Sequence, residues 1–220
     1  LAGIAAASEN QQTVEVQGLR QPAEVLIDRW GVPHIYAGDH YDAFFVQGYN
    51  ASRDRLCQID LWRRRGLVGL SEVLGGAYAE QDRASRLFLY RGDMYREWLA
   101  YGSDAKRIAE AFVAGINAFV ARTEGDPSLL PPEFELLGYR PARWRASDVV
   151  RIRSHGMWRN VASEVTRAQV ACRFGLDTDT LRRKLAPDWT PKVPEGLDPC
   201  SIPADVLHDY ELATSGVEFE

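Results

Sequence analysis

The sequence lacks the short motifs that identify many catalytic and nucleotide-binding sites. Its four histidines, at positions 34, 40, 155 and 208, form neither an HExxH pair nor a Cys/His cluster, which argues against a zinc enzyme. No GxGxxG or P-loop occurs, and Gly69–Val73 lacks the second glycine of a nucleophile elbow. The chain therefore presents no catalytic constellation of its own.

Long apolar runs and an excess of positive charge are also absent. Without a run of about twenty apolar residues, no membrane-spanning helix is expected. A net charge of -5 argues against nucleic acid as a partner, and the one basic run, Arg63–Arg65, is predicted to be a solvated helix end or a set of internal ion pairs. With 220 residues, 45% of them hydrophobic, the chain is long enough for one or two globular domains.

Cysteine is scarce, with three residues in the chain, and the odd number leaves at least one thiol unpaired. Cys57 falls within a predicted helix beside its apolar stripe and is interpreted as a buried apolar residue. A bridge between Cys172 and Cys200 is possible in an oxidising compartment, although their spacing does not require one.

Two short strands and a long helix are predicted between Val25 and Trp62. β-Branched and aromatic residues flank a bend at Gly31 and Pro33, and Thr13–Ile27 is predicted to form two short strands joined by a turn. Asp39 is a predicted N-cap. The helix would bury the stripe Phe45, Gly48, Tyr49, Ser52, Leu56, Ile59 and Trp62, and would leave Arg53, Asp54, Arg55 and Asp60 mostly on other faces.

Further helices are predicted downstream. A short helix is expected over Leu67–Ala77 and mixed helix over Gln81–Leu99. A helix after Asp104 would stop at Glu124–Pro127. Another, capped by Ser147 and Asp148, would run to Cys172. The helix after Asp104 would bury the face formed by Ile108, Ala111, Phe112, Gly115, Ile116, Phe119 and Val120. The helix that runs to Cys172 would bury the face formed by Val149, Ile152, Gly156, Val161 and Val165.

Five short motifs follow one another in the first third of the chain and carry a family resemblance. They are Gly31–His34, Phe45–Tyr49, Asp54–Leu56, Gln58 with Asp60, and Arg63–Arg64. In this order and spacing they resemble the amino-terminal signature of the penicillin acylase family of N-terminal nucleophile (Ntn) hydrolases. The likeness continues through Gly69–Gly75, Gly115–Phe119, Leu130–Phe134, Trp144 and Asp148–Val149, and it fades after Cys172.

The resemblance implies an α+β fold in which this predominantly helical chain forms part of an αββα sandwich shared with a separate β chain. In Ntn hydrolases the first residue of a chain is the nucleophile and its own α-amino group is the base. Leu1 has no nucleophilic atom, so the nucleophile is expected to be a Ser that heads the β chain after autoproteolytic cleavage of a common precursor. This chain is then the α subunit of a heterodimer, with no catalytic residue of its own.

The expected reaction is hydrolysis of a linear acyl amide through an acyl-enzyme, without an organic cofactor. Substrates in the family include the side-chain amides of β-lactam antibiotics, acyl-homoserine lactones and lipopeptides. The regions around Leu130–Trp144 and Asp148 favour a penicillin-type substrate. A non-catalytic helical binding or interaction module is the alternative, because the chain has no catalytic constellation.

The resemblance also implies an acyl-binding role for the helix after Asp148. The family places a Met and an aromatic side chain against the acyl group, and Met157 matches the Met when residues are counted from Asp148. The same count puts Val161 at the aromatic position, whereas counting back from Glu164 puts Trp158 there. Met and Trp suit an acyl cavity, but both could equally be core or interface residues of a helix.

Glu164 is implied to bind a structural calcium ion that is held mainly by the β chain. A carboxylate from a second chain suits a hard cation that takes about six to eight oxygen ligands.

Three segments are expected along the chain. Residues 1–12 would be a disordered remnant, residues 13–185 the α-subunit domain, and residues 186–220 a proline-rich strap and tail that ends near the maturation site. The opening residues could be what remains of a signal peptide, and the family resemblance implies a periplasmic or secreted protein.

Overall fold

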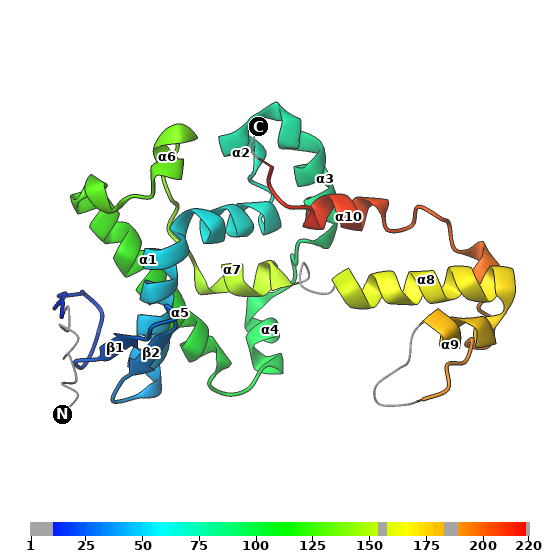
Figure 1. Cartoon of the computed structure of the whole chain (residues 1–220), viewed down its shortest axis with the longest axis horizontal. Helices are drawn as coiled ribbons and strands as arrows, with labels where there is room; N and C mark the ends of the chain where they lie inside the picture. The colour runs from blue at the N-terminus through cyan, green and yellow to red at the C-terminus, as the bar shows by residue number, and fades with distance from the viewer. Residues whose placement is uncertain (1–10, 154–157, 183–188, 219–220) are drawn as a thin grey trace, which may run out of the picture.

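The computed structural model describes residues 11–153, 158–182 and 189–218 (Figure 1). The described residues are mostly helical and include a single small sheet, so the predominantly helical chain is confirmed. The strands are β1 (Glu24–Ile27) and β2 (Pro33–Tyr36). The α-helices are α1 (His40–Gly66), α2 (Ser71–Leu74), α3 (Ala79–Phe88), α4 (Met94–Ala100), α5 (Ala105–Gly125), α6 (Pro132–Leu136), α7 (Ala146–Arg151), α8 (Trp158–Phe174), α9 (Asp179–Arg182) and α10 (His208–Thr214).

The two strands form an antiparallel hairpin in which Val25 lies opposite Ile35. Gly31 turns the chain with a φ of 79°, a conformation that favours glycine. The Asp28 carboxylate accepts backbone hydrogen bonds from Trp30 and Val32, which fixes the bend. The predicted pair of strands around Gly31 is confirmed. No strand forms over residues 11–16, so the additional strand predicted near Thr13 is wrong.

Helix α1 begins as predicted, because the Asp39 side chain accepts a hydrogen bond from the Asp42 backbone nitrogen at 2.8 Å. The helix is not straight: Arg55 has φ -144° and ψ 31°, and Figure 1 shows the resulting bend. This break shifts the helical phase of the residues that follow. Trp62, predicted to be buried, is therefore 54% exposed, whereas Asp60, predicted to lie on another face, is fully buried.

Asp60 is stable in the interior because charged and polar groups surround its carboxylate. Arg64 Nε donates to one oxygen at 2.8 Å and the Ala142 backbone nitrogen donates to the other at 3.1 Å. A buried carboxylate paired in this way connects α1 to the loop that precedes α7.

Helices α1 and α5 cross at two glycines, and this contact is the centre of the fold. A Cβ atom on Gly48 would lie 1.9 Å from the Phe112 carbonyl oxygen, and one on Gly115 would lie 1.9 Å from the Phe45 carbonyl oxygen. Only glycine permits this approach of two backbones. The predicted buried face of α5 is confirmed at Ala111, Gly115, Ile116, Phe119 and Val120.

The single helix predicted from Asp148 to Cys172 is wrong, because α7 and α8 are separate helices. Helix α7 starts after Arg145 rather than at Ser147, and the Asp148 carboxylate accepts from the Arg145 backbone nitrogen at 2.9 Å. The predicted helices over Leu67–Ala77 and Gln81–Leu99 are likewise divided, into α2 with a 3₁₀ turn and into α3 and α4.

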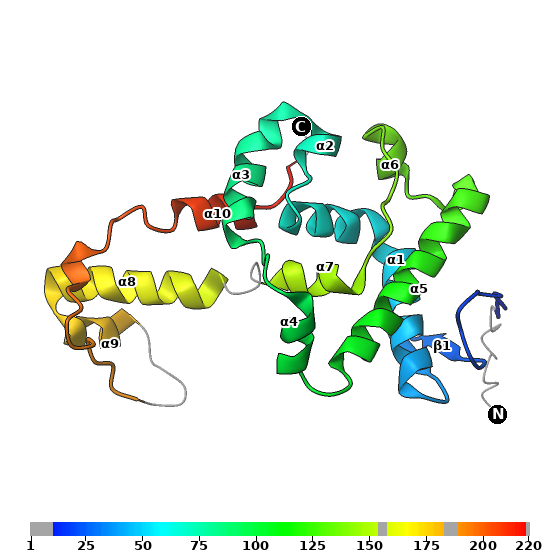
Figure 2. The same ribbon diagram turned by 180° about the vertical axis from the view of Figure 1, so that it is seen from behind.

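The described chain has two parts, which we call the body (residues 11–153 and 208–218) and the arm (residues 158–182 and 189–207). In Figures 1 and 2 the arm extends to one side of the body. Helix α10 returns to the body, where the Tyr210 ring packs edge-on against Phe88 with centroids 4.9 Å apart. Arg65 Nη1 also donates to the carbonyls of Thr214 and Ser215, which fixes the end of α10 on α1.

Every buried apolar side chain of the described residues lies in the body. In the arm, the described residues that are buried are the polar residues Ser163, Arg167 and Asp179. The core of the body consists of Leu56, Cys57, Leu61, Leu70, Val113, Ile116, Phe119, Val120, Phe134 and Trp144.

Candidate functional site

The predicted site residues that the structure describes, Trp158, Val161 and Glu164, lie in the first two turns of α8. Met157 lies outside the described residues, and Trp158 is the first residue of α8. Val161 is half-buried, and Glu164 follows one turn later with its side chain 58% exposed. Because residues three apart in a helix share a face, Val161 and Glu164 are neighbours on the surface of α8.

The chain leading to α8 is attached firmly to the body. Asp148 in α7 pairs with Arg63 Nε of α1 at 2.7 Å, and this pair is largely buried. Arg151 Nη1 donates to the Tyr90 carbonyl at 2.9 Å, and Arg153 pairs with Glu97 of α4. These contacts fix the position of the last described residues before α8.

Glu164 belongs to a network of ion pairs inside the arm. Both of its oxygens accept from Arg167 Nη1 at 2.7 Å, and Arg167 Nε donates to Asp179 at 2.9 Å. Asp179 also accepts from Arg182 Nε at 2.7 Å. This network joins α8 to α9. The described residues of the arm are thus held together by ion pairs rather than by buried apolar side chains.

The network shifts the pKa values of its two buried members. Burial alone would raise the pKa of Asp179, but hydrogen bonds from Arg182 and Arg167 outweigh it and lower the pKa below its ordinary value. Burial alone would lower the pKa of Arg167, but hydrogen bonds to Asp179 and Glu164 raise it above its ordinary value. Asp179 and Arg167 are therefore both charged at neutral pH.

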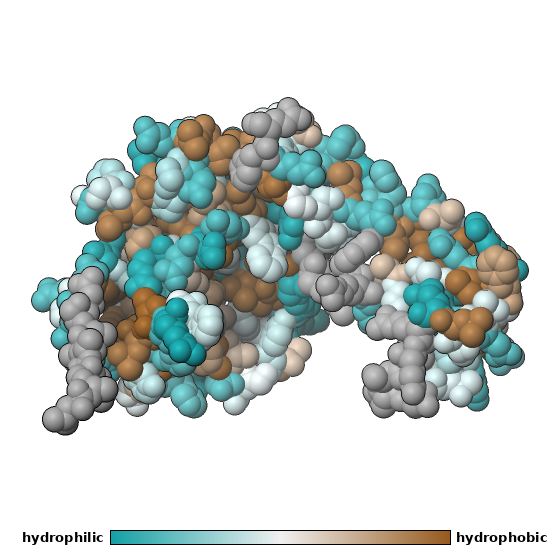
Figure 3. All heavy atoms as spheres, in the orientation of Figure 1, coloured by the Kyte–Doolittle hydropathy of each residue, from teal (hydrophilic) through white to brown (hydrophobic). Residues whose placement is uncertain are grey.

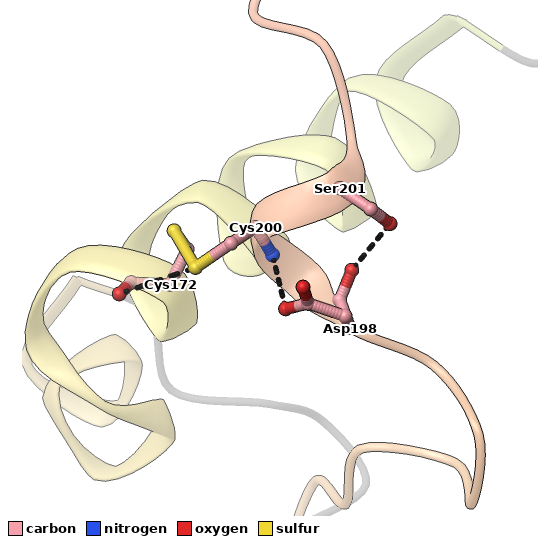
Figure 4. The surroundings of a disulfide bond; sticks show 4 residues. All are labelled: Cys172, Asp198, Cys200 and Ser201. Carbon is pink, nitrogen blue, oxygen red and sulfur yellow. Dashed lines mark hydrogen bonds between the residues drawn. A yellow bond between two sulfur atoms is a disulfide. The ribbon is translucent and has the colours of Figure 1, made fainter.

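A disulfide bond joins α8 to the 3₁₀ turn Pro199–Ser201, which follows α9 in the chain. Cys172 and Cys200 are linked, with their Cα atoms 4.9 Å apart (Figure 4). The Asp198 side chain accepts from the Cys200 backbone nitrogen at 2.9 Å, and the Asp198 carbonyl accepts from Ser201 Oγ at 2.7 Å. The bridge that the sequence left open is thus present.

Cys57 is free and buried, as predicted, and burial raises the pKa of its thiol.

This chain does not supply a complete metal site from its described residues. They contain no cluster of three or more His, Cys, Asp or Glu side chains arranged to hold a metal ion. Calcium takes about six to eight oxygens, so Glu164 alone offers at most two of them. Its exposure leaves it accessible to a second chain, but Arg167 already occupies both of its oxygens. Glu164 therefore fits only as one ligand of a shared site, after a rearrangement.

Two cavities lie elsewhere in the body, and neither is lined by Val161 or Glu164. One of about 450 Å³ lies between the start of α1 and the start of α5 and is lined by Arg20, Asp39, His40, Tyr41, Asp104, Arg107, Ile108 and Glu110. Another of about 430 Å³ lies around α6.

None of the helices within the described ranges is both long and apolar enough to cross a membrane.

Sequence reasoning did not identify Arg167 and Asp179, the two buried charged residues next to Glu164. Arg167 lies one turn after Glu164, so helical spacing could have suggested that pair. The partnership of Arg167 with Asp179 depends on how α9 folds back on α8, which no local pattern encodes.

Comparison with solved structures first defines the class of this fold. The chain superposes on a thermostable penicillin G acylase from Alcaligenes faecalis with a TM-score of 0.58 and 26% sequence identity, covering 79% of this chain and 98% of the solved chain. The fold is thus that of an acylase chain.

Sequence comparison then identifies the family. The family model described as penicillin amidase matches residues 22–201, and the chain therefore belongs to the penicillin amidase family. It is 35% identical over 175 residues to penicillin acylase 2 proenzyme from Pseudomonas sp. (strain SE83), covering 75% of this chain and 22% of that protein. It is 28% identical over 205 residues to acyl-homoserine lactone acylase QuiP from Pseudomonas fluorescens, covering 92% of this chain and 24% of that protein. The chain thus spans less than a quarter of the length of either relative.

Proposed function

We propose that this chain is the α subunit of a heterodimeric amidohydrolase that cleaves a linear acyl amide into an acid and an amine. The nucleophile would be the N-terminal Ser of a β chain cut from the same precursor. Its hydroxyl would attack the amide carbonyl to form an acyl-enzyme, the amine would leave with a proton, and water would release the acid. This chain would contribute to binding of the acyl group rather than to the bond-breaking step.

The extent of the matched chains is the observation that carries this proposal. The chain covers 98% of the solved acylase chain but only 22% of the proenzyme relative. A chain of this extent therefore has a counterpart as a separate polypeptide in a penicillin G acylase structure. That correspondence supports a subunit, and it disfavours a self-sufficient binding module.

The surface of the arm provides independent physical support. Phe174, Leu181, Trp189, Val193, Leu197 and Val206 are all exposed there. Figure 3 shows apolar surface on the arm as well as on the body. Apolar side chains gathered on a part that has no apolar core are typical of a surface completed by a partner. We propose that the β chain covers them and that residues 189–206 act as a strap across it.

The acyl pocket would be formed where α8 begins. Met157, with Trp158 or Val161, would contact the acyl group, and the anchored α7 would fix the start of that helix. Glu164 would supply one carboxylate to a calcium ion that joins the two chains, a structural rather than a catalytic role. Because Glu164 stands outside any cluster of three or more candidate ligands within the described residues, the remaining oxygens would come from the β chain.

The protein is also proposed to be exported to the periplasm or beyond the cell. The Cys172–Cys200 disulfide supports this, because such bonds persist in oxidising compartments.

The proposal is tested by expressing the complete gene and measuring the intact masses of the purified protein under denaturing conditions. A chain of about this mass accompanied by a heavier chain whose first residue is Ser is expected. The same preparation should hydrolyse a chromogenic phenylacetyl anilide and lose that activity when the Ser is replaced by Ala. A single folded monomeric species without amidase activity would contradict the subunit and favour the interaction module.

An acyl-homoserine lactone is the second candidate substrate. The match to acyl-homoserine lactone acylase QuiP extends over 92% of this chain, further than the 75% matched by the penicillin acylase 2 proenzyme. Comparing kcat/KM for the phenylacetyl anilide with that for a long-chain acyl-homoserine lactone separates the two. A Met157→Ala variant should change the ratio of the two values if Met157 lies in the acyl pocket.

A further inference from the structure

The position of Arg167 on Glu164 is that of a chelated cation. Arg167 Nη1 lies 2.7 Å from both Glu164 oxygens, so it lies in the plane that bisects the carboxylate. A calcium ion bound by both oxygens of one carboxylate occupies the same bisecting plane, at about 2.3–2.6 Å from each oxygen. The two cations therefore compete for one place on the carboxylate.

Arg167 has a second carboxylate partner that it can keep when it leaves Glu164. Its Nε donates to Asp179, and its guanidinium lies 5.6 Å from the centre of the Trp189 ring. Release of Nη1 alone would therefore leave Arg167 paired with Asp179. The arm would keep the link between α8 and α9.

The two carboxylates differ in access and in number of partners. Asp179 is 3% exposed and is paired with both Arg167 and Arg182, whereas Glu164 is 58% exposed and is paired with Arg167. An incoming cation can reach only Glu164. The two arginines and two carboxylates form a neutral set, so these four side chains need no metal ion to balance their charge.

We propose that Arg167 fills the cation position of Glu164 while calcium is absent, and that Glu164 exchanges Arg167 for calcium when the metal binds. This inference rests on the proposed function, because calcium and the second chain come from it. The exchange makes calcium binding weaker than the carboxylate alone would allow. It also leaves Glu164 with a positively charged partner while the metal is absent.

The test is a calcium titration by calorimetry on the assembled two-chain protein after removal of metal with a chelator. Arg167→Gln removes the competing charge and still carries an amide N–H that can donate to Asp179. Loss of the charged hydrogen bonds from Arg167 to Glu164 should tighten calcium binding about tenfold or more, because calcium no longer has to displace them. Arg182→Gln is the matched control, since it removes an arginine from Asp179 and leaves the Glu164 pair intact. Its calcium affinity should equal that of the wild type.

The outcomes separate this inference from the proposed function. If Glu164→Gln abolishes calcium binding but Arg167→Gln leaves it equal or weaker, the exchange is overturned and the calcium ligand stands. If Glu164→Gln binds calcium like the wild type, or the wild type binds none, both the exchange and the role of Glu164 as a calcium ligand are overturned.

A crystal structure of the calcium-loaded wild type provides a test without substitution, should Arg167→Gln fail to assemble. Arg167 Nη1 should lie beyond hydrogen-bond distance of Glu164, with Nε still on Asp179. If Nη1 remains between both oxygens, the exchange is overturned.

Discussion

The body and the arm of this chain are stabilised by different kinds of interaction. In the body, α1 and α5 pack with backbones in contact at Gly48 and Gly115, and a continuous apolar core surrounds that crossing. In the arm, α8, α9 and the strap are joined by ion pairs and one disulfide bond. The comparison shows that burial of apolar side chains holds the body together, whereas the described arm depends on charged pairs and a covalent bond.

The largest effect is expected at the helix crossing. Gly115→Ala places a Cβ 1.9 Å from the Phe45 carbonyl oxygen, so the helices must separate. The free energy of unfolding should fall by about 3 kcal/mol or more, measured by denaturant unfolding of the mature protein. Gly125→Ala, in the same helix with nothing within 4 Å of the added carbon, should have little effect. Equal effects of the two would show that the crossing is not close-packed.

The buried carboxylate of Asp60 should have the next largest effect. Asp60→Ala leaves the mostly buried Arg64 guanidinium without its ion-pair partner and the Ala142 N–H without an acceptor. We expect a loss of about 3 kcal/mol. Glu110→Ala removes an exposed carboxylate paired with Lys106 and should change stability by about 0.5 kcal/mol. If both variants unfold at the wild-type denaturant concentration, Asp60 does not connect α1 to the loop before α7.

Reduction of the disulfide should affect the arm and not the body. Cys172 and Cys200 are 28 residues apart, and a loop of that size is worth about 3 kcal/mol when closed. Hydrogen exchange of the double variant Cys172→Ser, Cys200→Ser should therefore be faster over residues 189–206. Exchange in α1 and α5 should remain unchanged. Faster exchange throughout the body would contradict the separation of the two parts.

The smallest effect is a local loss of stability in acid. The pKa of Asp179 is lower in the folded arm than its ordinary value of 3.8, so its pairing contributes fully above about pH 4. The contribution is lost as pH falls through the folded pKa. Hydrogen exchange in α8 and α9, corrected for intrinsic rates, should rise in that range for the wild type. An Asp179→Asn variant should show a flatter dependence; an equally steep one would exclude Asp179 as the source.

The hairpin, the start of α1 and the buried face of α5 could be predicted because each depends on local chemistry. The Asp39 cap, the Gly31 bend and the spacing of apolar residues in α5 are readable along the chain. The break at Arg55 was not readable, and it reverses the positions expected for Asp60 and Trp62. A buried Asp is stable there because Ala142, far along the sequence, supplies a donor.

The candidate site was predictable only in part, and for a similar reason. Resemblance identified Val161 and Glu164 on α8 as candidates, but helical periodicity merged α7 and α8 into one helix. Arg167 and Asp179 were not anticipated because their pairing requires α9 to fold against α8. Met157 lies outside the described residues, so its role remains a prediction.

Hydroxyl-radical footprinting of the mature protein tests most directly whether the arm is completed by a partner. Phe174 and Trp189 are 69% and 53% exposed in this chain alone. If the β chain covers the arm, both should be labelled several-fold less in the native protein than after the chains are dissociated in mild denaturant. Labelling of both at the level of freely exposed rings in the native protein would contradict a partner on the arm.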